Sequence, residues 1–229
     1  MKRLLNYFTK FEIGLWTISV VLILFSFFVF DRDNYLILIA SIIGATFLIF
    51  NAKGNPIGQF LTVVFSMLYG KISCEFSYYG EMITYLGMTM PMAFFALISW
   101  LKNPYNNNKS EVKVNKLSKK EIVFMFVLTA FVTIVFYYIL KYFNTANLMP
   151  STISVTTSFL AVYLTFRRSP YFALAYAMND LVLIVLWALA SIEDKSYFSV
   201  VICFVVFFVN DMYGFVNWKR MEKKQKENI

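Results

Sequence analysis

Eight long apolar segments divide this chain and limit what it can fold into. They cover approximately residues 11–30, 34–51, 55–73, 82–101, 121–143, 147–166, 170–190 and 196–218. Each is close to the ~17–25 residues that a helix needs to cross a bilayer. Charged residues make up only 15% of the chain, below the roughly 25% that is typical of a soluble domain. The sequence therefore predicts an all-α integral membrane protein with eight transmembrane helices.

The distribution of basic residues predicts how these helices are oriented. If the N-terminus is cytoplasmic, all but four of the 21 Lys and Arg residues fall on the cytoplasmic side. The exceptions are Arg32, Lys71, Lys141 and Lys195, and all of their loops except that of Lys141 also carry acidic residues. Because cytoplasmic loops are enriched in Lys and Arg, we expect a multi-pass protein of the cell (plasma) membrane with both termini in the cytoplasm. The net charge of +8 then needs no partner other than water and the anionic lipid bilayer, and no nucleic acid.

The chain also repeats itself in two halves of four helices. The first and fifth segments both begin with a capping-box pattern, and the third and seventh both begin with a polar residue followed by a proline. Trp100 and Trp218 lie at the ends of the fourth and eighth segments, 118 positions apart. An even number of crossings per half makes the halves parallel. Transporters built from such repeats place their substrate site at the repeat interface.

The seventh segment carries polar residues where lipid would otherwise surround the helix. Asn179 and Asp180 lie at its centre, and Trp187 follows about two turns later on the same face. An ionised carboxylate at mid-membrane costs roughly 2.5–3.5 kcal/mol on insertion scales, so it normally faces protein or a water-filled cavity. Two interpretations stay open. The residues line a substrate site, or Asn179 makes a structural bond between helices beside a protonated Asp180.

Other helices supply residues of the same kind, and all of them are candidates for substrate binding. The candidates are Gln59, Ser66 and Tyr69 in the third segment, Asn179, Asp180 and Trp187 in the seventh, and Asn210 and Asp211 in the eighth. For the eighth segment a purely structural role is the stronger alternative. In the fourth segment, Pro91 is expected to free a carbonyl group and to kink the helix.

These side chains indicate the chemistry of a ligand. Amides bind hydroxyls and carboxamides, aromatic faces stack on rings and attract cations, and the aspartates favour positive charge. No Lys, Arg or His lies in the middle of any segment, so a phosphate finds no countercharge there. The pattern predicts a neutral or cationic, hydroxylated ligand with a ring. The chain contains no histidine and only two cysteines, so the sequence predicts no metal or cofactor and argues against an enzyme.

Four motifs resemble those of the PnuC family of vitamin transporters. They are NAKGNPIGQ at 51–59, YGEMITYLGMTMPM at 79–92, NDLVLIVLW at 179–187 and VNDMYGFVNWKRM at 209–221. The resemblance covers about residues 34–221. It implies the SWEET-like arrangement of two parallel three-helix bundles joined by a linker helix (3+1+3), with an extra N-terminal helix. The implied regions are 1–33 for the extra transmembrane helix, 34–102 for the first bundle, 103–146 for a basic cytoplasmic loop and the linker helix, 147–220 for the second bundle and 221–229 for a cytoplasmic tail.

The resemblance also implies a function. Family members take up nicotinamide riboside, a precursor of NAD, by facilitated diffusion with alternating access around a midplane site, and a cytosolic riboside kinase traps the product. The family further implies a homotrimer. This sequence has Phe172, Ala173 and Tyr176 where many relatives carry a Trp-rich stretch. Another vitamin or nucleoside such as thiamine, or a proton-coupled carrier, therefore stays an alternative, as does a subunit of a larger assembly.

Overall fold

A computed structural model describes residues 7–75, 79–145 and 147–227 of the chain. Within these ranges, eight helices are long and apolar enough to cross a membrane, as the sequence predicts. Six of them are single α-helices: α2 (Lys10–Phe30), α3 (Tyr35–Ala52), α4 (Pro56–Glu75), α7 (Lys119–Tyr142), α8 (Leu148–Phe166) and α9 (Tyr171–Glu193). The other two are composite: α5 (Tyr79–Ile83), η1 (Thr84–Thr89) and α6 (Met90–Lys102), then η2 (Lys195–Tyr197) and α10 (Phe198–Glu227).

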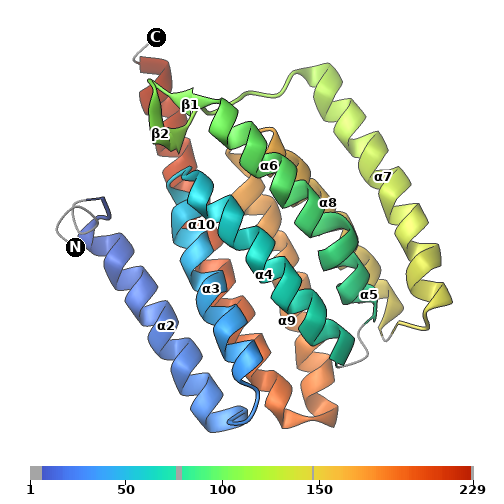
Figure 1. Ribbon diagram of the computed structural model, residues 1–229. Coiled ribbons are helices and arrows are strands. Elements are labelled where there is room, and N and C mark those ends of the chain that lie inside the picture. The colour runs from blue at the N-terminus through green and yellow to red at the C-terminus, as the bar shows by residue number, and fades with distance from the viewer. Residues whose placement is uncertain (1–6, 76–78, 146, 228–229) are drawn as a thin grey trace.

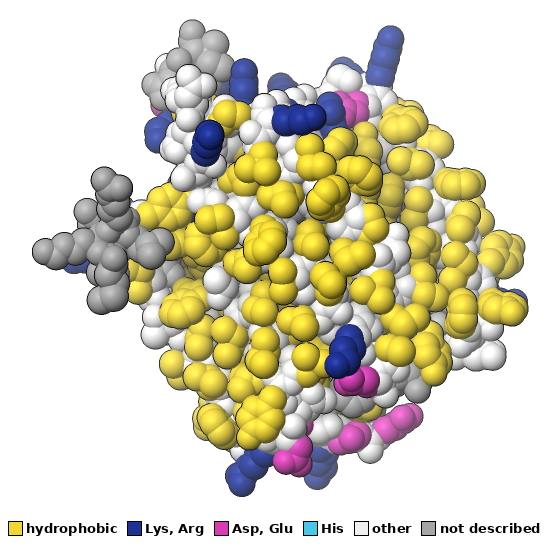
Figure 2. Space-filling view, viewed as in Figure 1, with side chains coloured by type: hydrophobic (Ala, Val, Ile, Leu, Met, Phe, Trp, Pro, Cys, Tyr) yellow, Lys and Arg dark blue, Asp and Glu magenta, His cyan; other side chains and the backbone are white. Residues whose placement is uncertain are grey.

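The helices stand side by side, with α2 and α7 at opposite edges of the molecule (Figure 1). In the middle, α3 packs against α4 and α10, and α9 packs against α8 and α10. Hydrophobic side chains cover most of the face shown in Figure 2, and Lys, Arg, Asp and Glu gather toward its two ends. Such a belt is how a multi-pass membrane protein meets the hydrocarbon of a bilayer.

Two helices begin at the capping residues that the sequence indicates. The Thr9 side chain accepts a hydrogen bond from the backbone N–H of Glu12, and the Glu12 carboxylate accepts one from the backbone N–H of Thr9. At α7, the Ser118 side chain accepts from the backbone N–H of Glu121. The Glu121 carboxylate instead forms an ion pair with Arg167, at the end of α8. These caps satisfy N–H groups that the first turn of a helix leaves unpaired.

The fourth span is not a continuous α-helix. Thr84–Thr89 forms a π-helical segment, η1, and the backbone N–H of Met90 donates to the carbonyl of Tyr85. Pro91 has no N–H and cannot donate a helical hydrogen bond to the preceding turn. The irregularity therefore lies immediately before the proline, where a kink is expected, and it lies at the depth of the cavity described below.

The loop and tail at one end of the molecule contain more regular structure than the sequence predicts. Within 103–118, β1 (Pro104–Tyr105) and β2 (Asn108–Val112) form an antiparallel hairpin. Asn106 and Asn107 at its turn both have positive φ, 47° and 58°, which Asn tolerates better than most residues. Residues 221–227, expected to be a separate tail, continue α10. The Gln225 amide fixes this extension by donating to the carbonyl of Val112 at 3.1 Å.

The sequence repeat reappears in hydrogen bonds between the two halves. The indole N–H of Trp100 donates to the Thr165 carbonyl at 2.9 Å, and that of Trp218 donates to the Asn51 carbonyl at 2.7 Å. Each tryptophan thus binds a carbonyl in the last turn of a helix from the other half, and each of these carbonyls also accepts from a backbone N–H three residues later, at 2.9 Å. The neighbouring bonds from Ser99 to the Phe166 carbonyl and from Asn217 to the Ala52 carbonyl repeat the exchange. This reciprocity supports two equivalent halves, whereas their division into three-helix bundles stays a prediction.

Candidate functional site

A small cavity of about 40 Å³ lies between the two halves of the chain. Residues of α3, α4, η1, α8, α9 and α10 line it. Its aromatic lining consists of Phe47, Phe65, Tyr85, Tyr176, Phe204 and Phe207. Its polar lining consists of Asn51, Thr62, Thr89, Ser158, Asn179, Asp180 and Asp211. A cavity of this volume holds a few water molecules at most, since one water needs ~10–15 Å³ of such space.

Asn179 is held in place by α8. Its carbonyl oxygen accepts hydrogen bonds from the hydroxyls of Ser154, Thr157 and Ser158, at 3.3, 2.8 and 3.1 Å. Its amide nitrogen donates no hydrogen bond to the residues that the structure describes, and the side chain lines the cavity. The three hydroxyls fix which way the amide faces, because the amide oxygen can only accept. The contact between helices that the sequence allows for Asn179 is therefore present through its oxygen, whereas a role in substrate binding stays a prediction.

The carboxyl groups of Asp180 and Asp211 lie next to each other across the α9–α10 contact. Both line the cavity, and both are buried, at 4% and 5% exposed. Two buried carboxyl groups side by side do not both ionise readily, because like charges repel strongly where water is excluded. The two side chains therefore form an acidic pair in the cavity wall.

Tyr69 and Trp187 form an aromatic cluster with Tyr85 at one end of the cavity. The rings of Tyr69 and Tyr85 lie 4.4 Å apart between centroids, and those of Tyr69 and Trp187 lie 6.3 Å apart, edge to face. Phe65 stacks on Tyr69 at 5.5 Å. Of these four, only Tyr85 and Phe65 line the cavity. Trp187 and Tyr69 lie behind them and close this end.

The remaining candidates contact other parts of the protein. The Gln59 amide donates to the side chain of Asn51 at 2.8 Å, and the Ser66 hydroxyl donates to the carbonyl of Thr62 at 2.8 Å. Asn51 and Thr62 both line the cavity, so Gln59 and Ser66 contact residues of the cavity lining and not the cavity itself.

The Asn210 amide donates to the hydroxyl of Ser19 at 2.9 Å and to the carbonyl of Val206 at 2.8 Å. Since Ser19 belongs to α2, Asn210 connects the N-terminal helix to α10. This contact agrees with the structural alternative considered for the eighth segment. Of the eight candidate residues, the structure brings Asn179, Asp180 and Asp211 together at the cavity surface.

Two buried groups near the cavity were not among the predicted site residues. Tyr85 lines the cavity from the π-helical segment, and the irregular helix there is the signal that could have indicated it. Glu81, which the sequence places in an outer loop, is 1% exposed in α5. Its Oε2 atom has no hydrogen-bond partner among the described residues. Its apolar neighbours in sequence gave no indication of this burial.

The cationic residues near the other end of the cavity are all engaged elsewhere. Lys53 pairs with Glu12 at 3.0 Å, Arg167 pairs with Glu121, and the Arg168 guanidinium donates to the Ser99 hydroxyl at 2.8 Å. None of them lines the cavity. Trp100, Trp218 and Phe172 fill this end, with centroid distances of 4.9–6.2 Å. Aromatic clusters thus close the cavity at both ends.

Comparison with known proteins identifies the family. The sequence model of a family described as nicotinamide mononucleotide transporter matches residues 34–220. This chain belongs to that family. Two curated members are named nicotinamide riboside transporter PnuC. The one from Neisseria mucosa is 25% identical over 228 residues, which cover 97% of this chain and 86% of the relative. The one from Haemophilus influenzae is 23% identical over 194 residues, covering 84% and 82%.

A solved structure shares the fold. The crystal structure of a protein described as the vitamin B3 transporter PnuC superposes with a TM-score of 0.83 at 23% identity, over 95% of this chain and 94% of that one. The PnuC resemblance of the four sequence motifs is therefore confirmed, as are the all-α fold and the multi-pass membrane setting. PnuC proteins are transporters, so the family also confirms that the chain is not an enzyme.

Proposed function

We propose that this chain carries nicotinamide riboside across the cell membrane. The observation that carries the proposal is the pair of Asp180 and Asp211 in a cavity lined by aromatic rings. Nicotinamide riboside is a pyridinium cation with a carboxamide and ribose hydroxyls. In this proposal a carboxylate of the acidic pair balances the pyridinium charge, the aromatic rings stack on the pyridinium, and the Asn179 amide nitrogen donates to an oxygen of the ligand. The names of the curated relatives support the same substrate.

The absence of cations from the cavity favours the riboside over the mononucleotide. Among the residues that the structure describes, no Lys or Arg lines the cavity, and the phosphate of a mononucleotide would have no countercharge there. Thiamine, which also carries a cationic ring, stays the alternative substrate. A binding titration of both ligands against the purified protein discriminates between them. A lower dissociation constant for thiamine than for nicotinamide riboside would refute the riboside assignment.

Alternating access explains how a ligand reaches so small a cavity. Sites for small molecules usually measure ~300–1,000 Å³, whereas this cavity measures about 40 Å³. The helices must therefore separate at one end or the other, and the aromatic clusters at the two ends are the proposed gates. The moving parts in this proposal are the bundles at 34–102 and 147–220, with the 103–146 region as their connection and the 1–33 helix as an addition. The end with Lys53 and Arg168 faces the cytoplasm, and so do both termini.

Facilitated diffusion with no coupled ion is the simplest energetics for this site. Two buried carboxyl groups, Asp180 and Asp211, could bind and release a proton during transport, so a proton-coupled carrier stays the alternative. Uptake of labelled nicotinamide riboside into liposomes separates the two. We expect the internal concentration to rise to the external one and no further, and to be unchanged by a pH gradient. Accumulation that depends on a pH gradient would refute diffusion and support coupling.

A matched pair of variants tests the site itself. The double variant Asp180→Asn with Asp211→Asn removes both carboxyl groups from the cavity, and Asp31→Asn with Asp33→Asn makes the same chemical change in the loop after α2. We expect uptake to fall in the first variant and to stay at the wild-type rate in the second. Equal uptake by both would show that the site lies elsewhere. A homotrimer and a cytosolic riboside kinase that traps the product complete the proposal, and the mass of the detergent-solubilised protein tests the trimer.

A further inference from the structure

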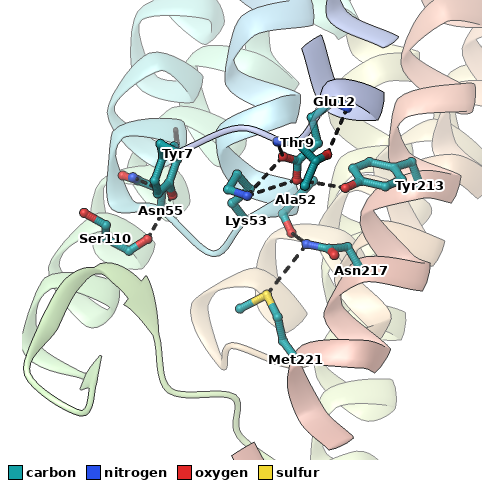
Figure 3. Close-up of polar contacts among 10 residues, drawn as sticks. All are labelled: Tyr7, Thr9, Glu12, Ala52, Lys53, Asn55, Ser110, Tyr213, Asn217 and Met221. Atoms are coloured by element: carbon teal, nitrogen blue, oxygen red, sulfur yellow. Dashed lines mark hydrogen bonds and ion pairs between the residues drawn. The ribbon is translucent and has the colours of Figure 1, made fainter. Parts of the chain in front are cut away.

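A groove lies where the first turns of α2, the end of α3 and the C-terminal half of α10 meet; Figure 3 shows polar contacts among residues of these elements. It consists of two hollows of about 690 and 420 Å³. Both hollows are lined by Lys53, Asn217 and Arg220, so they join at these residues. The groove lies outside the central cavity, since no residue lines both.

The larger hollow has an apolar wall. Phe11 on α2 is 63% exposed, and Met212 and Val216 on α10 are exposed as well. Met212 and Val216 are four residues apart, so they form one stripe along the helix. Because α2 and α10 are both candidate membrane spans, this wall faces hydrocarbon. A ligand of this arm must therefore be apolar, as an acyl chain is.

The charge of Glu12 is fully compensated inside the protein. Its carboxylate accepts hydrogen bonds from the Lys53 ammonium at 3.0 and 3.1 Å, from the Tyr213 hydroxyl at 2.8 Å and from the backbone N–H of Thr9 at 2.7 Å (Figure 3). An ion pair with this many donors leaves little uncompensated charge. Glu12 therefore does not repel an anion at the groove.

Two cations that line the groove have no acidic partner among the described residues. Lys219, Lys223 and Lys226 of α10 each form an ion pair within the helix. Arg220 and Lys224, in the same stretch, form no ion pair or hydrogen bond among the described residues, and both line the groove. Their spacing of four places them on one face of α10. The cations without acidic partners are therefore the ones that face the groove.

The smaller hollow is polar, and hydrogen bonds hold the side chains of its wall in place. The Tyr7 hydroxyl donates to the Ser110 carbonyl at 3.1 Å and accepts from the Asn55 amide at 3.0 Å. Burial raises the pKa of Tyr7 above its usual value, so the hydroxyl keeps its proton. The acid of this hollow, Glu111, accepts from the Gln225 amide at 3.0 Å. Hydroxyl and amide groups suit a headgroup that carries hydroxyls.

We propose that this groove binds an anionic glycerophospholipid. An acyl chain lies along Phe11 and α10, the phosphodiester lies between Arg220 and Lys224, and the headgroup reaches the polar hollow. Basic pockets between membrane helices bind anionic lipid headgroups in this way. A zwitterionic headgroup would bring a further cation toward Arg220 and Lys224, so the groove favours phosphatidylglycerol over phosphatidylcholine.

The test compares two variants with the same change of charge. Arg220→Gln removes a cation from the groove, whereas Lys223→Gln removes one from the exposed side of the same helix. Phosphatidylglycerol retained by the purified protein is titrated by native mass spectrometry, with phosphatidylcholine as the reference lipid. Loss of a charge-assisted bond is expected to weaken phosphatidylglycerol binding roughly tenfold in Arg220→Gln. Lys223→Gln and Arg220→Lys are expected to bind it as the wild type does.

Three results would overturn the proposal. The first is equal weakening in Arg220→Gln and Lys223→Gln, which indicates attraction to the basic helix as a whole. The second is equal retention of the two lipids by the wild type. The third is protection of the wild type from thermal unfolding by inorganic phosphate to the same extent as by phosphatidylglycerol, which indicates a site for a free anion. Because Arg220 is exposed, its replacement is not expected to prevent folding.

Discussion

The exchanged tryptophan bonds predict that one end of the central cavity can be loosened selectively. Trp218→Phe removes the indole N–H that binds the Asn51 carbonyl at 2.7 Å. Trp218 is fully buried, and the carbonyl keeps another donor, the backbone N–H of Gly54 at 2.9 Å. Loss of one hydrogen bond from an acceptor that keeps another costs about 0.5–1.5 kcal/mol. The cost applies while this end is closed and disappears when it opens and water enters.

That free energy converts into a change of population. A shift of about 0.5–1.5 kcal/mol changes an equilibrium by about 2- to 13-fold, so the fraction of molecules open at this end should rise by that factor. A cysteine in place of Thr89, which lines the cavity, reports the opening. The background carries Cys74→Ala and Cys203→Ala, which remove both native thiols. The rate of labelling by a membrane-impermeant thiol reagent is measured from each side of sealed vesicles.

We expect faster labelling from the side of Lys53 and Arg168, and no change from the other side. Trp16→Phe is the matched control, because its indole N–H donates to the Thr46 hydroxyl at 3.1 Å on the surface of the protein. This control should leave both rates unchanged. Equal acceleration from both sides in Trp218→Phe would indicate general loosening. An unchanged rate would show that the bond does not hold this end closed. Either result would refute the reasoning.

Three further perturbations follow from the structure. Replacing both Asp180 and Asp211 by Asn removes all acidic groups from the cavity lining, so binding of nicotinamide riboside should weaken about tenfold or more. An uncharged nucleoside should lose less affinity, and equal losses in calorimetric titrations would contradict this. Asn179→Ala removes the acceptor of the Ser154 and Ser158 hydroxyls and should lower the free energy of unfolding by about 1–3 kcal/mol, seen as a lower midpoint of denaturation. Gly44→Ala places a methyl group 2.0 Å from the Phe207 ring and should destabilise the folded protein by about 1–3 kcal/mol. In Gly14→Ala the methyl group meets nothing within 4 Å, so this control should not be destabilised. Equal stability of the two variants would contradict the packing.

The spans and the repeat were predictable because both depend on signals that act along the chain. An apolar segment long enough for a bilayer, and a capping residue such as Thr9, determine a helix with little help from its neighbours. The exchange between Trp100 and Trp218 follows from the same repeat, since equivalent residues make equivalent contacts. The bonding partners themselves were not predictable, because they are backbone carbonyls, which carry no sequence signal.

The cavity lining was predictable only in part, because it depends on which face of each helix turns inward. Asn210 and Asp211 are adjacent in sequence, yet the first binds α2 and the second lines the cavity. The π-helical segment depends on Pro91 together with close packing around it. A methyl group at Gly70 would lie 2.5 Å from Leu86 in that segment. Such three-dimensional fits have no signature in a single sequence.

The repeat has a consequence for how an asymmetric ligand is held. Equivalent positions of the two halves line the cavity with different chemistry: Phe65 is matched by Asn179, 114 positions later, and Thr89 by Phe207, 118 positions later. The acidic pair belongs to the second half alone, since Asp211 is matched by Ala93 in the first. A twofold scaffold with identical halves would accept a ligand in two orientations, related by the pseudo-axis. Here the frame is nearly symmetric and the lining is not. Under the proposed function, a molecule with a charged ring at one end and a sugar at the other would therefore bind in a single orientation and keep it as the halves move.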